Sequence, residues 1–244
     1  MTQVTVIMSI YNRPRLTKQT IENMREYAGI PFKLWIVDDG SEQETKDYLA
    51  SLKPEGYCEE VELVTYTDSV GKAKRLNEFL VKKDYDFCCV LDNDVLLPVD
   101  WLKKCVRSLV EDEGIGLACV NVQGIDPRII LKEYGNPERL IALTIGGACM
   151  VWGSFVRDNI TTFCEDYGRY GHEDAHFTQE VRVKNKAVIV LKEFGIHLDD
   201  RHLEKDSDTE WDKQYKKMKN DCATSGVETL RNNMKILQDS IKNK

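Results

Sequence analysis

The amino-acid sequence predicts an α/β fold built on a mixed, mostly parallel sheet that is flanked by helices. Short β-branched segments alternate with segments that carry apolar residues at helical spacing through the first half of the chain. The chain has 244 residues, of which 42% are apolar, which suits one large domain with its own core. Polar clusters follow several predicted strands, where parallel α/β sheets bind their ligands.

Strand and helix alternate four times in the first half. We predict strands at 4–10, 32–37, 61–66 and 87–91, and helices at 15–28, 41–52, 71–83 and 99–111. Ser41 is expected to cap the second helix, with Glu44 three residues later as in a capping box. Connections of this kind join parallel strands and put helices on both faces of the sheet.

The second half is less regular. We predict strands at 116–122 and 187–191, a helix at 174–184 and a loop-rich excursion at 123–140. The last forty residues are expected to be helical, with an apolar stripe formed by Val227, Leu230, Met234, Leu237 and Ile241. That stripe either packs on the domain's own surface or forms a dimer seam. The expected organisation is a domain at 1–202, with halves 1–98 and 99–202, and a helical extension at 203–244.

Composition excludes several classes of protein. The longest unbroken apolar stretches have five residues, far below the roughly 18 of a membrane helix, and no signal peptide opens the chain. The 41 acidic and 34 basic residues give a net charge of −7, which disfavours nucleic acid as a partner. The eight cysteines form no CxxC pair and lie mostly in apolar contexts. We therefore expect reduced thiols and a cytoplasmic protein that starts at Met1.

The segment Asp92-Asn93-Asp94 follows an apolar strand and is the first candidate for chemistry. Alternate residues of an extended chain point the same way, so both carboxylates are expected on one side. Two oxygen ligands suit Mg²⁺ or Mn²⁺, which take further ligands from water and phosphate. A solvated turn is the alternative, because Asp and Asn favour turns.

Two other strand ends carry groups that suit a nucleotide. Asp38 and Asp39 follow the second strand, where a carboxylate can accept a hydrogen bond from uracil or ribose, and Tyr11 offers a flat face for a base. The basic sequence Gly71-Lys72-Ala73-Lys74-Arg75 opens a helix, whose N-terminus attracts phosphate. A strand-to-helix turn and a solvated basic face are the respective alternatives.

A third acidic element, Gly171-His172-Glu173-Asp174, begins a helix. Acidic residues are favoured there by the helix dipole, but Asp174 can instead act as a general base for a sugar hydroxyl. His197 follows the last predicted strand, where it is either structural or completes a metal site begun by Asp94.

Taken together, these elements resemble glycosyltransferase family 2, the inverting nucleotide-sugar-dependent enzymes with the GT-A fold. The resemblance covers about residues 3–200. The matching segments are SIYNRP (9–14), IVDDGS (36–41), GKAKRLNEFL (71–80), VLDNDVLLP (90–98), GGACMV (146–151), GHEDAHF (171–177) and His197.

The resemblance implies a role for each matching residue. The donor-binding residues it implies are Tyr11 stacked on the base, Asp39 bound to the base, Asp38 helping to shape that pocket, Arg75 near the base or diphosphate, Asp92 on the ribose with Asn93 beside it, and Gly146 and Gly147 near the sugar. It further implies metal ligation by Asp94 and His197, and general-base catalysis by Asp174 with Glu173 beside it.

The implied reaction moves a sugar from a UDP-linked donor, with Mn²⁺ or Mg²⁺ as cofactor, to a hydroxyl of a glycan or other acceptor. The GGACMVW segment is also similar to enzymes of which some retain the anomeric configuration, so inversion is favoured rather than required. A nucleotidyltransferase is the nearest rival, but the loop after its first strand is usually glycine-rich, unlike SIYNRPR. A non-catalytic sugar-binding module and a transferase that acts on DNA bases are the remaining alternatives.

Overall fold

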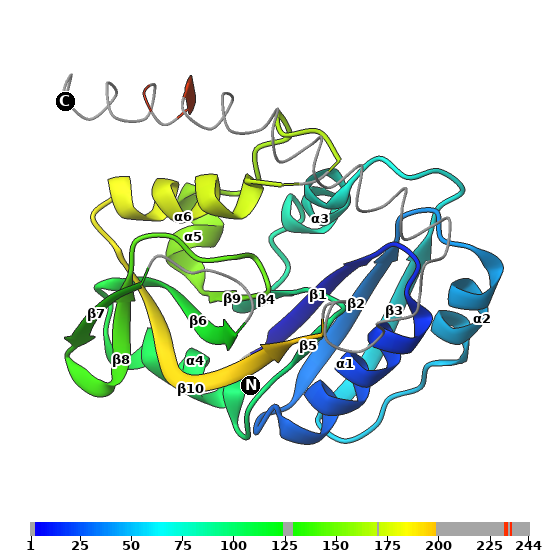
Figure 1. Ribbon diagram of the computed structural model, residues 1–244, viewed down its shortest axis with the longest axis horizontal. Helices are drawn as coiled ribbons and strands as arrows, with labels where there is room; N and C mark the ends of the chain where they lie inside the picture. Colours follow the sequence, from blue (N-terminus) through cyan, green and yellow to red (C-terminus); the bar gives the residue numbers. More distant parts are fainter. Residues whose placement is uncertain (1–2, 124–128, 170, 199–231, 234, 236–244) are drawn as a thin grey trace.

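The computed structural model describes residues 3–123, 129–169, 171–198, 232–233 and 235 of the chain. Their architecture is a large twisted sheet between two layers of helices (Figure 1). The strands are β1 (Val4–Ile10), β2 (Phe32–Asp38), β3 (Cys58–Thr65), β4 (Phe87–Leu91), β5 (Val95–Leu96), β6 (Ile115–Gln123), β7 (Ile129–Tyr134), β8 (Asn136–Ala142), β9 (Cys149–Trp152) and β10 (Ala187–His197). The helices are α1 (Pro14–Tyr27), α2 (Gln43–Ser51), α3 (Lys72–Leu80), α4 (Trp101–Glu111), α5 (Ser154–Asn159) and α6 (Glu173–Val183).

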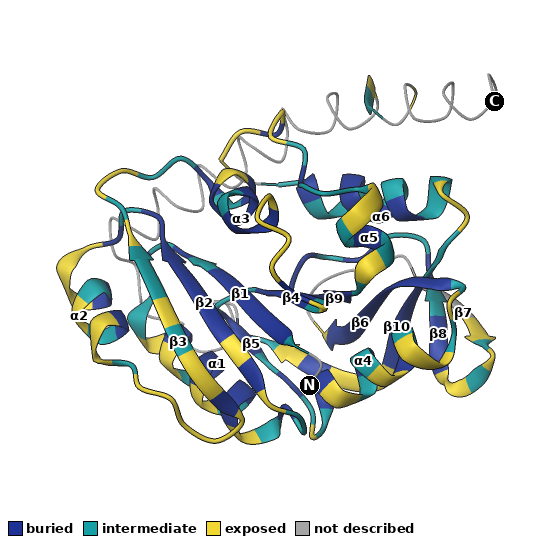
Figure 2. Ribbon diagram, turned by 180° about the vertical axis from the view of Figure 1, so that it is seen from behind, coloured by how far each residue is buried: buried dark blue, intermediate teal, exposed yellow. Residues whose placement is uncertain are grey.

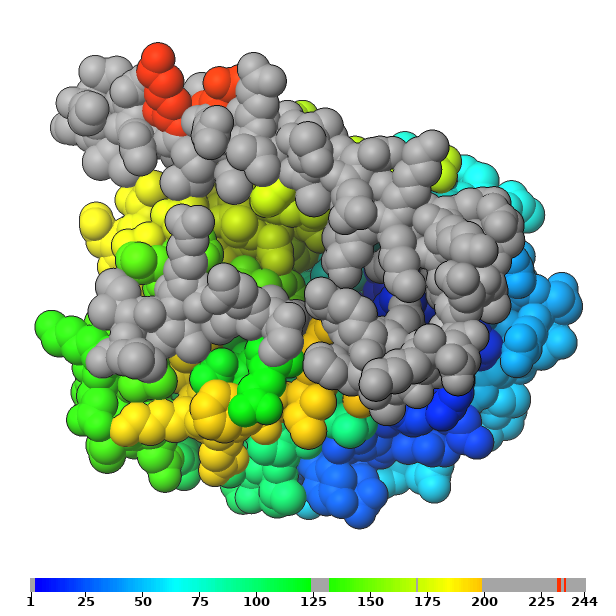
Figure 3. Space-filling view, viewed as in Figure 1, coloured from blue at the N-terminus to red at the C-terminus, as the bar shows by residue number. Residues whose placement is uncertain are grey.

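The strands lie in the order β3-β2-β1-β4-β9-β6-β10-β8-β7, and β5 pairs with β10 beside this path. Strands β1 to β4 are mutually parallel where they pair. Beyond β4, only the β6–β10 pair is parallel among the strands described, and the others are antiparallel. In the space-filling view, the two halves of the chain lie side by side (Figure 3). The sheet is mixed, as the sequence predicts, and its antiparallel pairs all involve strands of the second half of the chain or β5.

Alternation along the central strands creates two separate cores. In β1, Val4, Val6, Met8 and Ile10 pack with the inner sides of α1, α2 and α4, whereas Ile7 faces α3, α5 and α6. Residues that alternate along a strand point to opposite faces, so a strand covered on both sides is apolar throughout. Figure 2 shows this burial in β1 and β2, in contrast to the edge strand β3.

The predicted elements of the first half are confirmed, but the Ser41 cap is wrong. Helix α2 starts at Gln43, and its N-cap residue Glu42 makes no side-chain capping bond. Ser41 instead donates its backbone N–H to Asp38 Oδ1 (2.9 Å) and accepts from the backbone N–H of Asn12 with its hydroxyl (2.8 Å). Its side chain thus joins the ends of β1 and β2 rather than capping the helix.

The second half contains more regular structure than predicted. Much of the expected loop-rich excursion at 123–140 is a hairpin formed by β7 and β8, and α5 was not predicted. The strand expected at 187–191 continues to His197. The first part of β10 pairs with β8, and its last two residues pair with β5. The predicted helical extension lies outside the described residues apart from positions 232, 233 and 235, and all five residues of its apolar stripe lie outside them.

The sequence predicts no membrane-spanning helix and reduced cysteines, and the described residues bear on both predictions. No helix among them has the length and apolar character needed to cross a membrane. Their seven cysteines are free thiols, and all except Cys164 are buried.

Polar side chains of α1 hold the chain between β4 and α4. Thr20 accepts a hydrogen bond from the backbone N–H of Val95 (2.9 Å), and Asn23 accepts one from that of Leu97 (2.6 Å). The contacts repeat regularly: every third residue along the helix contacts every second residue along the extended segment. The three contacts join Thr17 with Asn93, Thr20 with Val95, and Asn23 with Leu97. Helix α1 therefore sets the position of the Asp92-Asn93-Asp94 segment.

We predict that Thr20→Val lowers the free energy of unfolding by about 1–3 kcal/mol, because the buried N–H of Val95 loses its acceptor. Urea denaturation of the variant and the wild type measures the difference. Lys18→Ala on the exposed side of the same helix is the control, with an expected change within about 0.5 kcal/mol. A Thr20→Val variant as stable as this control would show that the contact does not hold the segment.

Candidate active site

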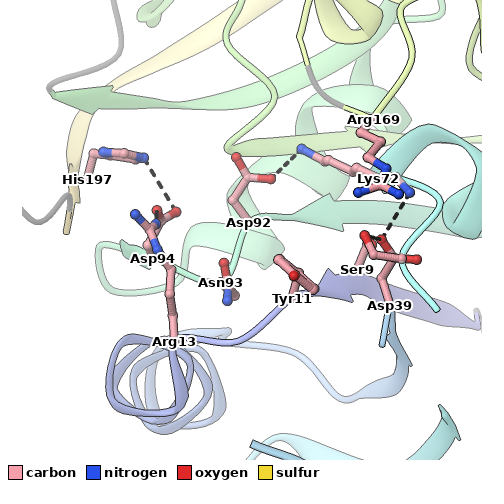
Figure 4. A pocket seen from close by; sticks show the side chains of 12 residues that line it. Ser9, Tyr11, Arg13, Asp39, Lys72, Asp92, Asn93, Asp94, Arg169 and His197 are labelled. Atoms are coloured by element: carbon pink, nitrogen blue, oxygen red, sulfur yellow. Dashed lines mark hydrogen bonds and ion pairs between the residues drawn. The ribbon is translucent and has the colours of Figure 1, made fainter. Parts of the chain in front are cut away.

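A pocket opens at the carboxyl ends of β1, β2 and β4 (Figure 4). The space between its walls is about 690 Å³, including the part that opens to solvent. Its lining residues are Ser9, Tyr11, Arg13, Asp39, Ser69, Gly71, Lys72, Asp92, Asn93, Asp94, Arg169 and His197. Residues from both halves of the chain therefore meet in one place.

Asp39 forms one wall of the pocket and organises the loop that leads into α3. One carboxylate oxygen accepts from Arg75 Nε (2.7 Å) and from the backbone N–H of Val70 (3.0 Å). The other accepts from Ser69 Oγ (2.8 Å) and the backbone N–H of Gly71 (3.0 Å). These bonds satisfy a carboxylate that is almost fully buried.

Asp38, expected to shape the base pocket, and Arg75, expected near the base or the diphosphate, are both absent from the pocket lining. Asp38 is fully buried and holds the turn into α2 through its bond with the Ser41 N–H. Arg75 lies against Asp39, bonds to Glu78 (2.9 Å), and has its guanidinium 3.4 Å from the centre of the Tyr66 ring. Both support the pocket wall from inside the fold.

The loop after β1 presents Tyr11 to the pocket. Asn12 and Arg13 both adopt the left-handed conformation, with φ of 56° and 62°. The Asn12 side chain accepts from the backbone N–H of Glu42 (2.7 Å), which ties this loop to the start of α2. In Figure 4 the Tyr11 ring lies between Asn93 and Asp39. The loop thus holds Tyr11 in the lining of the pocket.

Asp94 lies between a guanidinium and an imidazole. Its Oδ2 accepts from Arg13 Nη1 (2.7 Å), and its Oδ1 is 3.4 Å from His197 Nε2. The pairing of β5 with β10 explains the second contact, because it puts His197 opposite Val95, next to Asp94.

The donor atoms of Asp94 and His197 suit a divalent cation. Carboxylate oxygen and imidazole nitrogen are ordinary ligands of Mn²⁺, and their 3.4 Å separation allows one ion to contact both. The described residues provide no group of three metal ligands. An ion here would therefore take the rest of its ligands from water or from a bound phosphate.

Asp92 is paired with Lys72, the first residue of α3. Burial raises the pKa of the Asp92 carboxyl, and the charge of Lys72 opposes that rise. Burial alone would lower the pKa of the Lys72 ammonium, but the charges of Asp92, Glu173 and Asp174 outweigh it and raise that pKa. The ammonium is thus held in its charged form at the edge of the pocket.

Glu173 and Asp174 begin α6, beside the loop that contains Gly146 and Gly147. Asp174 Oδ2 accepts the backbone N–H of Gly147 (2.5 Å). A Cβ on Gly147 would lie 3.1 Å from Asp174 Cβ and 3.2 Å from Lys72 Nζ, so a side chain there would crowd both. Burial and then the neighbouring Asp174 charge raise the pKa of Glu173. Asp174 is outside the pocket lining and adjoins it through Lys72.

Six of the twelve predicted site residues line the pocket, which also contains residues that the sequence analysis did not assign. Tyr11, Asp39, Asp92, Asn93, Asp94 and His197 line it together. The unassigned cations are Arg13, Lys72 and Arg169. The sequence indicated Lys72, because it belongs to a basic helix start. No sequence pattern indicated Arg169. It reaches the pocket because its loop packs on Gly71, where an added Cβ would lie 2.5 Å from Arg169 Cα.

Comparisons with known proteins agree with this geometry. A family model described as glycosyl transferase family 2 matches residues 5–148. Poly-beta-1,6-N-acetyl-D-glucosamine synthase of Staphylococcus aureus is 23% identical over 130 residues, which are 53% of this chain but only 30% of that protein. The matched part is thus less than a third of that relative.

Solved structures share the GT-A-like fold. The mannosyltransferase PcManGT from Pyrobaculum calidifontis, in complex with GDP-Man and Mn²⁺, has a TM-score of 0.63 at 21% identity, over 80% of this chain and 56% of that one. GalNAc-T7 with UDP, GalNAc and Mn²⁺ has a TM-score of 0.64 at 12% identity, over 81% and 44%. S. aureus TarS in complex with UDP-GlcNAc has 0.58 at 16% identity, over 81% and 56%.

We predict that Arg75→Met lowers the free energy of unfolding by about 3–5 kcal/mol, because it leaves the Asp39 charge buried without its cation. The two side chains are only 5% and 4% exposed. Urea denaturation measures the loss. Arg107→Met, which removes an ion pair about half exposed, is the matched control and should cost at most about 1 kcal/mol. Equal losses in the two variants would contradict the role given to Arg75.

Proposed function

The chain belongs to glycosyl transferase family 2, and from this premise we propose that it is a metal-dependent transferase of hexosyl or N-acetylhexosaminyl groups from a UDP-sugar. The acceptor is a hydroxyl of a glycan or another molecule, and the anomeric carbon is inverted. The observation that carries the proposal is the meeting of Asp39, Asp92 and Asp94 in one pocket, with Asp174 adjoining it through Lys72.

The proposed donor lies along the carboxyl ends of β1, β2 and β4. Tyr11 stacks on the base, an interaction worth about 1–3 kcal/mol, and Asp39 bounds the base pocket. Asp38 and Arg75 shape that pocket by holding its wall. Asp92 binds the ribose with Asn93 beside it, and Gly146 and Gly147 admit the sugar.

Asp94 and His197 are the proposed ligands of Mn²⁺ or Mg²⁺. The ion, when bound, acts as a Lewis acid that offsets the negative charge on the departing nucleoside diphosphate. Arg13 contributes by holding the Asp94 carboxylate through one oxygen while the other faces His197. Solved structures with the same fold contain Mn²⁺ and nucleotide sugars, which supports this assignment.

Asp174 is the proposed general base, which takes the proton from the acceptor hydroxyl as that oxygen attacks the anomeric carbon. The backbone N–H of Gly147 orients its carboxylate. Glu173, buried next to it and bonded to the Gly171 N–H (2.9 Å), keeps the start of α6 in position.

The organisation of the chain belongs to the same proposal. The catalytic domain comprises residues 1–202, whose two halves at 1–98 and 99–202 contribute to a single sheet. We propose that residues 203–244, almost all outside the described residues, are a C-terminal extension whose apolar stripe offers a seam for a homodimer. We propose a cytoplasmic location and no nucleic-acid partner, in line with the net charge of −7.

A panel of nucleotide sugars tests the donor. We expect a UDP-sugar with Mn²⁺ at 100 times its Kd to stabilise the chain by about 2.7 kcal/mol, and GDP- and dTDP-sugars to stabilise it less. The midpoint of thermal unfolding should rise by about 5–10 °C. Omitting Mn²⁺ is the control and should reduce the shift. Release of pyrophosphate instead of UDP during turnover would point to a nucleotidyltransferase.

Two substitutions separate metal binding from base catalysis. We expect Asp94→Ala to abolish metal-dependent turnover, because the cation loses its carboxylate ligand. Asp174→Asn should keep donor binding and lose at least about 10²-fold in kcat, because the amide cannot accept the proton. Steady-state kinetics and UDP titration measure both effects. Near-normal turnover by Asp174→Asn would remove the base assignment.

A further inference from the structure

Lys72 occupies the junction between the donor pocket and the proposed base. It is the first residue of α3, lines the pocket, and pairs through Nζ with Asp92 Oδ1 (Figure 4). A Cβ on Gly147 would lie within 3.3 Å of both the Lys72 ammonium and Asp174 Oδ2, so the two groups lie next to the same glycine. Its side chain is 15% exposed, so little water screens its charge.

The charges around Lys72 are mostly negative. Asp92 at the end of β4 forms an ion pair with it, and the charges of Glu173 and Asp174 at the start of α6 act with Asp92 to raise its pKa. Arg169, in the loop before α6, accepts the backbone N–H of Lys72 with its carbonyl (3.4 Å), and its side chain lines the same pocket. On α3 itself, Arg75 is directed to Asp39 and Lys74 is exposed.

We propose that Lys72 is a positioning residue for both halves of the reaction, holding Asp92 on the donor side and balancing Glu173 and Asp174 on the acceptor side. The inference rests on the proposed function, because it assigns donor binding to Asp92 and base catalysis to Asp174. Neither the family match nor the sequence motifs gave Lys72 such a role.

The physical argument concerns like charges in a partly buried site. Asp92, Glu173 and Asp174 are three carboxylates around one ammonium, and without it their mutual repulsion disfavours ionisation. Loss of the cation therefore raises the pKa of Glu173 further and disfavours the charged form of the acidic start of α6. A general base must be ionised to accept a proton, so the acidic limb of the pH–rate profile moves to higher pH. Loss of the ion pair also frees Asp92 and weakens donor binding.

The experiment compares Lys72→Met, which has a similar length but no charge, with Lys72→Arg, which keeps the charge. Lys74→Met, an exposed lysine two residues further along the same helix, is the matched control. For each full-length variant, kcat and the donor KM are measured from pH 5.5 to 9, and carboxyl ¹³C NMR follows the titration of Glu173 and Asp174.

For Lys72→Met we expect the acidic limb and the carboxyl titration to move upward together by about 1–3 pH units, with a raised donor KM. The ratio of its kcat to that of the wild type should rise with pH. Lys72→Arg should stay near the wild-type profile, and Lys74→Met should match the wild type. Thermal unfolding of each variant confirms that it folds, and if Lys72→Met does not, Lys72→Gln takes its place.

A charge-removing variant that keeps the wild-type profile and titration would overturn the inference, as would an equal effect in Lys74→Met. These results are distinguishable from failure of the proposed function. A wild-type chain that binds no nucleotide sugar and transfers none would contradict the transferase, whereas the carboxyl titration would still decide whether Lys72 balances Glu173 and Asp174.

Discussion

The pocket depends on the pairing of two buried carboxylates, Asp39 and Asp94, and the half-buried Asp92 with cations from elsewhere in the chain. Asp39 pairs with Arg75, Asp92 with Lys72, and Asp94 with Arg13. A carboxylate taken out of water costs several kcal/mol unless a cation and hydrogen bonds compensate it. Three such groups at neighbouring strand ends are therefore compatible with folding only because α3 and the loop after β1 provide partners.

The same pairs divide into two functional kinds. Arg75 has no place in the pocket lining, so its bond to Asp39 is part of the wall, whereas Arg13 and Lys72 line the pocket together with their carboxylates. A bound diphosphate and cation would meet fixed charges of both signs, arranged before the ligand arrives. Such preorganisation lets charge move in a reaction without reorganising the surroundings.

The positions of Asp94 and His197 follow from contacts between helices and strands outside the pocket. Helix α1 holds the segment after β4 through three hydrogen bonds spaced along one side of the helix. On the other side of that segment, β5 pairs with β10, which brings His197 to Asp94 although 102 positions separate them in the chain. The contacts of α1, β5 and β10 thus hold Asp94 and His197 in position.

Sequence patterns alone determined the α/β class, the first four strands and helices, and most of the acidic and aromatic residues around the pocket. These follow from local periodicity and from the rule that parallel strands end at one edge. The tertiary structure alone decided the partner of each charge, the hairpin of β7 and β8, and the turn role of Ser41. Lys72 and Arg169 reach the pocket through contacts between distant segments. Ser41 does not cap α2 and instead accepts a hydrogen bond from the backbone N–H of Asn12. Contacts of this kind leave no periodic signal, because they depend on where separate elements come together and not on the residues beside them in the chain.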